Sequence, residues 1–491
     1  MGFLGGAFER GLRGVVTAGV LLVVLVASCS DGSSVEGTTT QLPHVDSSTS
    51  TTPIDATTRA TAAVSDSAAP CPATEPRPAT ESDWATYGFD DAISRHNPAE
   101  TRIGPGNVWC LEVLWSIDDL SGVTGTPIVI DGIVYFGDWN GMLHAVDADT
   151  GDLAWEEQVS QGAITATALV TDERIFVSDS DGFMYARDRA TGSAVWTVEV
   201  DAQPAAGIVA APVLVDDTLI VGVAGNNPFD VDYRGSIVAL DAATGVELWR
   251  IETTDETTGT GGGVWTTGAL DRDLGLAFFG TGNIWGTPVS PLSDALLAID
   301  YERGEISWKH QLNPEDTDDA DVGATPNLFT IDGRVVVGVG GKIGQFRVVD
   351  RQTGDEVWST ELTTGGNCCG VYATSALGDG VIYVNSIPRP GATSITFALD
   401  SRDGSILWQQ PIPSAVYGSL TLANGVVLHG SVAGRVYALD ARDGTILWSE
   451  KLPGNFGDGI SVAGGTLFVG YGFSIDLTGV RDGGIVAYSL P

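Results

Sequence analysis

Positive charge is scarce in this sequence. The chain has 24 Lys and Arg residues against 63 Asp and Glu residues, which gives a formal net charge of −39. Such a chain is repelled by nucleic acid and by anionic lipid surfaces, so neither is expected as a partner. Lysine is the rarer cation and occurs only at Lys309, Lys342 and Lys451. A lysine inside a conspicuous motif is therefore informative.

Cysteine and long apolar runs are also sparse. There are five cysteines in 491 residues and no Cys-x-x-Cys-His motif, which excludes a covalently attached c-type haem. The strongest apolar run, residues 15–27, follows Arg10 and Arg13 and is too short to span a bilayer comfortably. This pattern of charge followed by a short apolar run is typical of an export signal.

The apolar run ends in Val26-Ala27-Ser28-Cys29, which resembles a bacterial lipobox. The resemblance implies that residues 1–28 are a signal peptide and that Cys29 carries a lipid on the outer face of the cell membrane. The alternative is a secretory signal with an incidental cysteine, and either way the chain is expected to be exported. Residues 29–80 are rich in Ser, Thr, Ala and Pro and predict a disordered tether.

Export favours disulfides among the other four cysteines. Cys71 lies before the first folded segment and Cys110 lies within it, so a bridge between them would pin that segment. Cys368 and Cys369 are adjacent, and a bridge between neighbours closes a small, strained ring.

One phrase recurs through the rest of the chain: an apolar run, an Asp, a Thr-Gly or Asp-Gly turn, and a second run ending in Trp. It ends at Trp155, Trp196, Trp249, Trp308, Trp358, Trp408 and Trp448. Trp115 follows only the second half of the phrase, and residues 483–488 contain only the first half. Two further short strand patterns precede each turn, as in residues 126–130 and 132–137, so each unit has four strands.

The spacing predicts an all-β, eight-bladed β-propeller over residues 81–491. The Trp-to-Trp steps are 40, 41, 53, 59, 50, 50 and 40 residues, which is the period of four-stranded antiparallel blades. A solenoid would need capping repeats, and none is present. We expect the N-terminal strand ending at Trp115 to complete the C-terminal blade and to close the ring.

Residues 83–90 (Asp-Trp-Ala-Thr-Tyr-Gly-Phe-Asp) and 97–100 (Asn-Pro-Ala-Glu), together with the repeated phrase, make residues 82–491 resemble quinoprotein alcohol dehydrogenase propellers. The polyvinyl-alcohol-dehydrogenase type is the most similar. The resemblance implies oxidation of an alcohol, small or polymeric, with pyrroloquinoline quinone (PQQ) and Ca²⁺, and an external electron acceptor. Non-catalytic assembly lipoproteins share the repeat, so the repeat itself specifies only the fold.

The irregular stretches lie between Trp196 and Trp408. The stretch from Gly261 to Asn283 resembles the family segment in which a Trp stacks beneath PQQ and an Asn oxygen binds Ca²⁺, which assigns these roles to Trp265 and Asn283. A flat indole suits a flat quinone, and an amide oxygen suits a hard cation. A core Trp and a turn Asn are the alternative. Both residues are expected on the same face of the ring, Trp265 at the start of a first strand and Asn283 after a second.

The acidic segment 316–329 resembles the family segment whose Asp, near the metal, acts as general base. Asp321 fits this role best and Asp319 is the reserve, although an acidic loop can also be merely solvated. Lys342, in Gly-Gly-Lys-Ile-Gly, occupies the place where the family polarises the quinone carbonyl.

Two features depart from the family pattern. The Cys368-Cys369 pair resembles the Cys-Cys ring that covers the quinone in methanol-dehydrogenase-type relatives, but it lies in a later blade, just before an expected first strand at residues 371–376. It could cover the site or be purely structural. Where the family has a Glu that binds Ca²⁺, this chain has Asn226 or Asn227, with Asp230 and Asp232 further along the same insertion. The loss of one carboxylate weakens the expected metal site unless one of these Asp residues compensates.

The leading hypothesis is therefore a lipid-anchored, PQQ- and Ca²⁺-dependent alcohol dehydrogenase, attached to the membrane through its lipid alone. In it Asp321 accepts the alcohol proton, and Lys342 and Ca²⁺ draw charge onto the quinone. The alternative is a cofactor-free propeller that acts as a binding or assembly scaffold at the cell surface. A sugar-dehydrogenase-like enzyme is a weaker third possibility.

Overall fold

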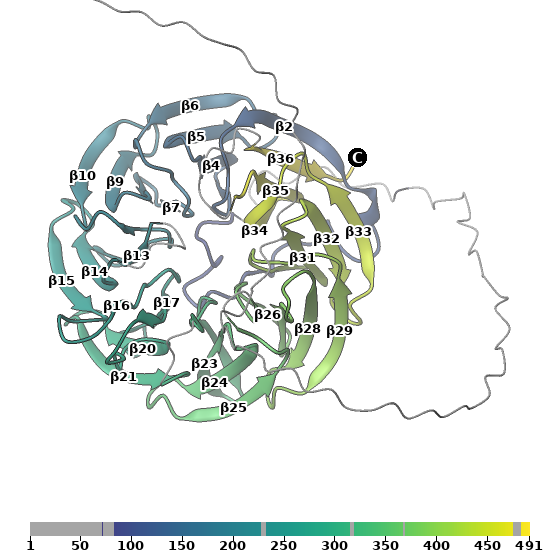
Figure 1. Ribbon diagram of the computed structural model, residues 1–491. Coiled ribbons are helices and arrows are strands. Elements are labelled where there is room, and N and C mark those ends of the chain that lie inside the picture. The colour runs from purple at the N-terminus through teal and green to yellow at the C-terminus, as the bar shows by residue number, and fades with distance from the viewer. Residues whose placement is uncertain (1–70, 72–82, 227–231, 315–318, 367–368, 475–482) are drawn as a thin grey trace, which may run out of the picture. The chain divides into compact units, whose positions relative to one another are not determined.

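A computed structural model describes Cys71 and residues 83–226, 232–314, 319–366, 369–474 and 483–491. These residues fall in one compact unit, and their strands form a ring of radial sheets around a central axis (Figure 1). The only helix in this part of the chain is the 3-10 turn η1 (Val108–Cys110). No helix among the described residues is long and apolar enough to cross a membrane.

Each of the first four blades consists of four antiparallel strands, numbered from the axis outward. Their strands are β3 (Ile128–Ile130), β4 (Ile133–Gly137), β5 (Met142–Asp147) and β6 (Leu153–Gln158); β7 (Leu169–Val170), β8 (Arg174–Ser178), β9 (Phe183–Asp188) and β10 (Ala194–Glu199); β12 (Val213–Val215), β13 (Thr218–Gly225), β14 (Ser236–Asp241) and β15 (Glu247–Glu252); and β17 (Ala269–Asp271), β18 (Leu276–Gly280), β20 (Ala295–Asp300) and β21 (Glu305–Gln311).

The next three blades repeat this order. Their strands are β22 (Asn327–Ile331), β23 (Arg334–Gly340), β24 (Gln345–Asp350) and β25 (Glu356–Glu361); β26 (Ala376–Gly378), β27 (Val381–Ser386), β28 (Ser394–Asp400) and β29 (Ile406–Ile412); and β30 (Thr421–Ala423), β31 (Val426–Ser431), β32 (Arg435–Asp440) and β33 (Ile446–Lys451). Small strands outside this pattern are β11 (Ala206–Gly207), which pairs with β13, and β16 (Thr260–Gly261), which pairs with β19 (Ile284–Trp285).

The eighth blade joins the two ends of the described chain. Its inner strands are β34 (Phe456–Ala463), β35 (Thr466–Tyr471) and β36 (Gly483–Ser489), and its outer strand is β2 (Glu112–Leu120). β2 pairs antiparallel with β36, so that Trp115 lies opposite Ala487. The predicted eight-bladed ring, closed by the N-terminal strand, is therefore confirmed (Figure 1).

The repeated Trp ties each blade to the next. In seven blades the indole Nε1–H donates to a backbone carbonyl in the third-to-fourth-strand turn of the following blade, over 3.0–3.2 Å. The turn's glycine lies on the indole: a Cβ on Gly304, for example, would come within 2.5 Å of Trp249. Because this glycine has φ +66°, glycine is favoured there twice, by backbone conformation and by space.

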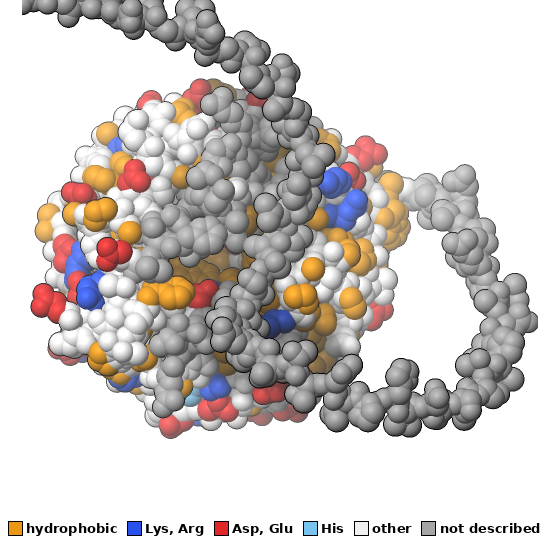
Figure 2. Space-filling model, in the orientation of Figure 1, with side chains coloured by type: hydrophobic (Ala, Val, Ile, Leu, Met, Phe, Trp, Pro, Cys, Tyr) orange, Lys and Arg blue, Asp and Glu red, His pale blue; other side chains and the backbone are white. Residues whose placement is uncertain are grey.

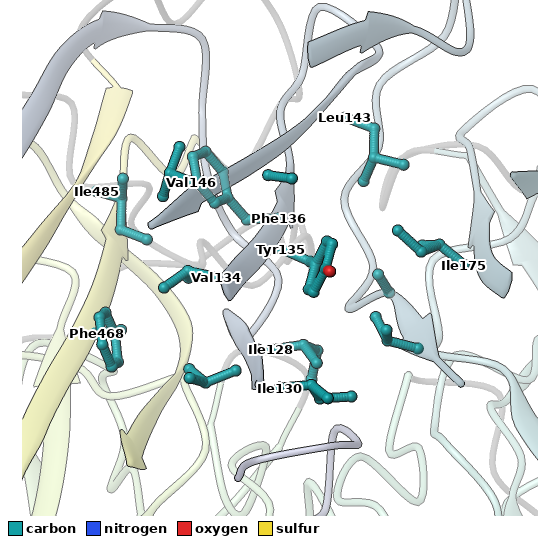
Figure 3. Packing of buried hydrophobic residues seen from close by; sticks show 14 of the residues in the cluster. Ile128, Ile130, Val134, Tyr135, Phe136, Leu143, Val146, Ile175, Phe468 and Ile485 are labelled. Atoms are coloured by element: carbon teal, nitrogen blue, oxygen red, sulfur yellow. The ribbon is translucent and has the colours of Figure 1, made fainter. Parts of the chain in front are cut away.

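Apolar packing between neighbouring blades forms the core. Figure 3 shows one such contact, in which Phe468 and Ile485 of the eighth blade approach β4 and β5, while Ile175 of the second blade approaches from the other side. Figure 2 shows Asp and Glu side chains dispersed over the visible face rather than gathered in one patch.

The N-terminal axial segment, residues 84–97, crosses the middle of the ring (purple in Figure 1). Its carbonyls accept backbone N–H bonds from the innermost strands of four blades, at Leu270, Leu328, Leu377 and Leu422. Arg95 is fully buried and donates to the carbonyls of Leu420 (2.6 Å) and Tyr87 (2.5 Å). β1 (His96–Asn97) then pairs in parallel with β30. Residues remote from the repeat thus cross-link the blades at the axis.

The structure tests the expected Cys71–Cys110 disulfide and the strand expected at residues 371–376. Cys71 and Cys110 form a disulfide, with their Cα atoms 5.8 Å apart, which confirms the bridge that pins the first segment. The expected first strand at residues 371–376 was wrong, because β26 begins only at Ala376. Gly370 has φ +90° and pairs with Ile387 in an isolated bridge, so the chain turns here and enters the strand late.

Candidate functional site

Alternating strand directions put two kinds of loop at the same end of the ring: the loop between blades and the loop between the second and third strands. Trp265 and Asp321 lie in loops between blades, before β17 and β22. Asn283 and Lys342 follow the second strands β18 and β23. The structure therefore places these four residues at one mouth of the central channel.

Three aromatic residues occupy equivalent positions at this mouth, each four residues before a first strand. Trp265 precedes β17, Tyr372 precedes β26 and Tyr417 precedes β30. The ring centroids of Trp265 and Tyr372 are 6.3 Å apart, and those of Tyr372 and Tyr417 are 5.1 Å apart. The blade between has Gly323 at this position, where a Cβ would lie 3.1 Å from the Trp265 ring. Glycine thus makes room for the indole.

Lys342 lies at the centre of this cluster. Its Nζ is 2.6 Å from Asp319 Oδ1 and 2.5 Å from Asp321 Oδ2, and its side chain is only 8% exposed. The ammonium also lies over the ring of Tyr372, at 5.2 Å from the centroid, and over that of Trp265, at 5.8 Å. Two carboxylates and two aromatic faces therefore fix a single buried cation.

The main chain holds the same cluster. The Asn283 N–H donates to Asp321 Oδ1 over 2.6 Å, and the Lys342 N–H donates to the Asp321 carbonyl over 2.9 Å. A Cβ on Gly282 would come within 2.9 Å of Asp321 Oδ1, so the Gly-Asn turn lets the carboxylate approach the backbone. Asp321 thereby links the loops that carry Asn283 and Lys342.

Burial shapes the ionisation of this site. It raises the pKa of Asp319 to about 7, and repulsion from Asp321 adds to the rise, while Lys342 opposes it. Burial alone would lower the pKa of Lys342, but attraction by Asp321 and its neighbours outweighs burial and raises that pKa above its usual range. Lys342 therefore stays charged, while Asp319 titrates near neutrality.

The tyrosines at the mouth were not predicted from the sequence. Burial raises the pKa of Tyr372 above its usual range and that of Tyr233, near Asp321, to about 12. Both hydroxyls therefore stay protonated. The signal that would have revealed Tyr372 and Tyr417 is their shared offset from a first strand, which places them in register with Trp265.

The structure brings Cys369 to the edge of the site, where it is buried with Ile387 and Ala415 in a cluster against which Tyr372 and Tyr417 pack. Cys368 and Asn227 lie outside the described residues. Asn226 follows β13, and its side-chain amide donates to the Pro204 carbonyl over 3.2 Å. Cys29 also lies outside the described residues.

The resemblance implies two bound groups, PQQ and Ca²⁺, and the side chains at this mouth fit PQQ better than Ca²⁺. A flat quinone has an indole face at Trp265 and a fixed cation at Lys342, so its ring and carbonyl are matched. Ca²⁺ takes six to eight oxygen ligands. Of the residues assigned to the metal, only Asn283 and Asp321 are in place within the described chain, where no group of three or more His, Cys, Asp or Glu could hold a metal ion. The described residues thus suit a quinone and not a Ca²⁺ ion.

The chain is an eight-bladed propeller with a cluster of charged and aromatic side chains at one end of its axis. The sequence profile of the glucose/ethanol/alcohol dehydrogenase β-propeller domain matches residues 84–364, more than half of the chain, and the chain belongs to this family. The profile of the outer membrane protein assembly factor BamB matches residues 344–489.

Individual relatives agree with this assignment. The chain is 27% identical to a polyvinylalcohol dehydrogenase of a Pseudomonas species over 290 residues, which are 48% of this chain and 45% of that protein. It is 27% identical to a quinohemoprotein alcohol dehydrogenase of Comamonas testosteroni over 376 residues, 63% of this chain and 51% of that one. The chain thus spans about half the length of these curated relatives.

The crystal structure of the Comamonas testosteroni enzyme superimposes with a TM-score of 0.73 at 21% identity. The superposition covers 83% of this chain and 80% of that one, and it shows that the two share a fold.

Proposed function

We propose that this protein is a PQQ-dependent oxidoreductase that oxidises an alcohol at the channel mouth formed by Trp265, Lys342 and Asp319. The observation that carries the proposal is the convergence of an indole face, a buried lysine and two carboxylates in a chain of this family. When bound, PQQ supplies the two-electron oxidant for the alcohol.

The residues of the site have separate tasks. The Trp265 indole would offer the quinone a stacking face. The Lys342 ammonium, held at 2.5 Å from Asp321, would donate a hydrogen bond to a quinone oxygen and favour negative charge there. Asn283 and Asp321 position Lys342 through the backbone and side-chain bonds described above.

Asp319 is the better candidate for the base that takes the alcohol proton, although the sequence pattern favoured Asp321. The Asp319 side chain is 27% exposed, against 7% for Asp321, so substrate can reach it. Both oxygens of Asp321 are engaged, one by the Asn283 N–H and the other by Lys342. The raised pKa of Asp319, about 7, also suits a general base that works near neutral pH.

The finer features implied by the sequence belong to the same proposal. The substrate is an alcohol, small or polymeric, and the electrons pass to a separate acceptor, since the chain has no haem-attachment motif. The lipobox-like Cys29 supports export and lipid anchoring on the outer face of the membrane. Replacing Cys29 with Ala is expected to release the protein from membranes into the soluble fraction.

A second candidate is a cofactor-free scaffold. It is favoured by the BamB profile match and by asparagines at the place where the family has a metal-binding Glu. It uses the same fold without the site, and it predicts no PQQ binding and no alcohol-dependent dye reduction.

The experiment is PQQ titration of the purified chain, followed by reduction of an artificial dye with primary alcohols and with polyvinyl alcohol. The expected result is saturable binding that quenches tryptophan fluorescence, at least about tenfold weaker in Trp265→Ala, and dye reduction with one substrate class. Trp109→Ala is the matched control, because Trp109 is 42% exposed and outside the site. Absence of saturable binding in the wild type would overturn the proposal and favour the scaffold.

A further inference from the structure

The Lys342 ammonium lies between the carboxylates of Asp319 and Asp321, a position that a divalent ion would occupy in a metal-dependent site. In the described chain it is the cation that contacts both Asp319 and Asp321, at 2.6 and 2.5 Å. We propose that Lys342 is the resident cation of this site and that the protein binds its quinone without a divalent metal ion. This inference rests on the proposed function and concerns how the same site is neutralised.

Both carboxylate oxygens of Asp321 already have partners. Oδ1 accepts the Asn283 N–H over 2.6 Å, and Oδ2 contacts the Lys342 ammonium. A divalent ion bound to Asp321 would displace one of these partners or lie beside the ammonium, and two cations at such a distance repel strongly in a poorly solvated site.

The Lys342 side chain is also held in its position between the two carboxylates. Its side chain is 8% exposed and lies over the rings of Tyr372 and Trp265. Its backbone is held on both sides, by the Lys342 N–H bond to the Asp321 carbonyl (2.9 Å) and by the Gly366 N–H bond to the Lys342 carbonyl (2.7 Å). With the backbone fixed, a swing of the side chain would lose both aromatic faces and both ion pairs and would leave Asp319 and Asp321 without their counter-ion.

The side chains that could supply oxygen ligands are also few. In the described chain they are Asn283, Asp319 and Asp321, against the six to eight oxygens that Ca²⁺ takes. Where the resemblance implies a Glu, the described residue is Asn226, whose amide donates to the Pro204 carbonyl in a neighbouring loop. An ammonium needs only two or three acceptors and finds two carboxylates, so Lys342 is satisfied by a donor set too small for Ca²⁺.

The first test measures PQQ binding to the full chain by tryptophan fluorescence, in excess EDTA and in excess CaCl₂. The expected dissociation constants agree within about threefold. A tightening of about tenfold or more in CaCl₂ overturns the inference and leaves the proposed function standing. Absence of PQQ binding under both conditions overturns the proposed function, and the second test then decides the role of Lys342.

The second test uses Ca²⁺ alone on cofactor-free protein, with calorimetry and thermal unfolding as readouts. Wild type is expected to show no saturable binding and no change in Tm. Lys342→Met is expected to have a lower Tm and to recover it in CaCl₂, because Asp319 and Asp321 then need a counter-ion. Saturable Ca²⁺ binding by wild type that is lost in Asp321→Asn overturns the inference.

Two further variants keep this test decisive. Lys451→Met is the matched control, because Lys451 lies in a different blade from Lys342 and its ammonium donates to the Ala433 carbonyl. The Tm of this variant is expected to be insensitive to Ca²⁺. If Lys342→Met does not fold, Lys342→Arg retains the charge. That variant is expected to stay insensitive to Ca²⁺, and a Ca²⁺-dependent rise in its Tm would overturn the inference.

Discussion

The two ends of the propeller differ in how far their contacts repeat from blade to blade. At one end the same contact recurs in seven blades, with an indole N–H bonded to the next blade's turn and a glycine lying on the indole. At the other end, Lys342 and Asp319 have no counterpart in any other blade of the described chain, and Trp265 has an aromatic counterpart only in the blades of Tyr372 and Tyr417. Repetition divides the stabilisation of the ring among many equal contacts, whereas chemistry at the other mouth depends on single residues.

The largest expected effect is at the unrepeated end. Asp319→Asn should lower kcat for alcohol oxidation about 10²- to 10⁴-fold, because the general base is lost, while Tm changes little. Wild-type kcat should rise with pH as Asp319 loses its proton near its pKa of about 7, and the variant should lose this step. Steady-state rates across pH and thermal unfolding measure both. If Asp321→Asn gives the larger loss of kcat at unchanged Tm, Asp321 is the base instead.

A smaller effect is expected at the repeated end. Gly304→Ala places a Cβ within 2.5 Å of the Trp249 ring, whereas Gly132→Ala meets nothing within 4 Å, and both positions have positive φ. Because both variants place Ala at a positive φ, the cost of backbone strain is similar in the two. Gly304→Ala should therefore lose about 1–3 kcal/mol more of the free energy of unfolding than Gly132→Ala. Denaturant unfolding measures the difference, and PQQ binding should be unchanged in both. Equal losses would mean that the indole yields without cost and that the repeated contact contributes little.

The smallest effect concerns a residue between the two ends. His429 in β31 is fully buried against Thr396, and burial lowers its pKa to about 4. Below about pH 6.5 His429 binds a proton in the unfolded chain, whereas in the folded chain it stays neutral until about pH 4. The free energy of unfolding therefore falls as the pH drops from 6.5 towards 4. Between pH 6.5 and 5.5 this loss is at most about 1.4 kcal/mol, and His429→Gln should remove it from the pH dependence of unfolding. An unchanged pH dependence in the variant would assign the acid sensitivity to other groups.

The sequence predicted the repeated end better than the unrepeated one, for a physical reason. The Asp, Gly and Trp of each phrase act locally or on an adjacent blade, so eight blades and their closure at Trp115 followed from spacing. Tyr372 and Tyr417 were not predicted, because one aromatic residue before a strand is indistinguishable from a core residue until the ring brings it beside Trp265.

The ranking of the two carboxylates shows the same limit. The motif gives Asp319 and Asp321 similar standing, and only their exposure and their partners distinguish a reachable carboxylate from an occupied one. The strand expected at residues 371–376 failed for a related reason. Its residues have strand-like composition, but the turn at Gly370 delays pairing until Ala376.

The split eighth blade has a consequence for the order in which the molecule assembles. Its outer strand β2 is synthesised first and its neighbour β36 last, and the Tyr471 hydroxyl donates to Asp118 across 353 residues of chain. Pairing at such sequence separation carries a high loop-closure cost and is slow. Seven blades can mature as local hairpins during synthesis, but ring closure waits for the final strand. Until residues 483–489 are synthesised, β2 has an open edge that can pair with other chains.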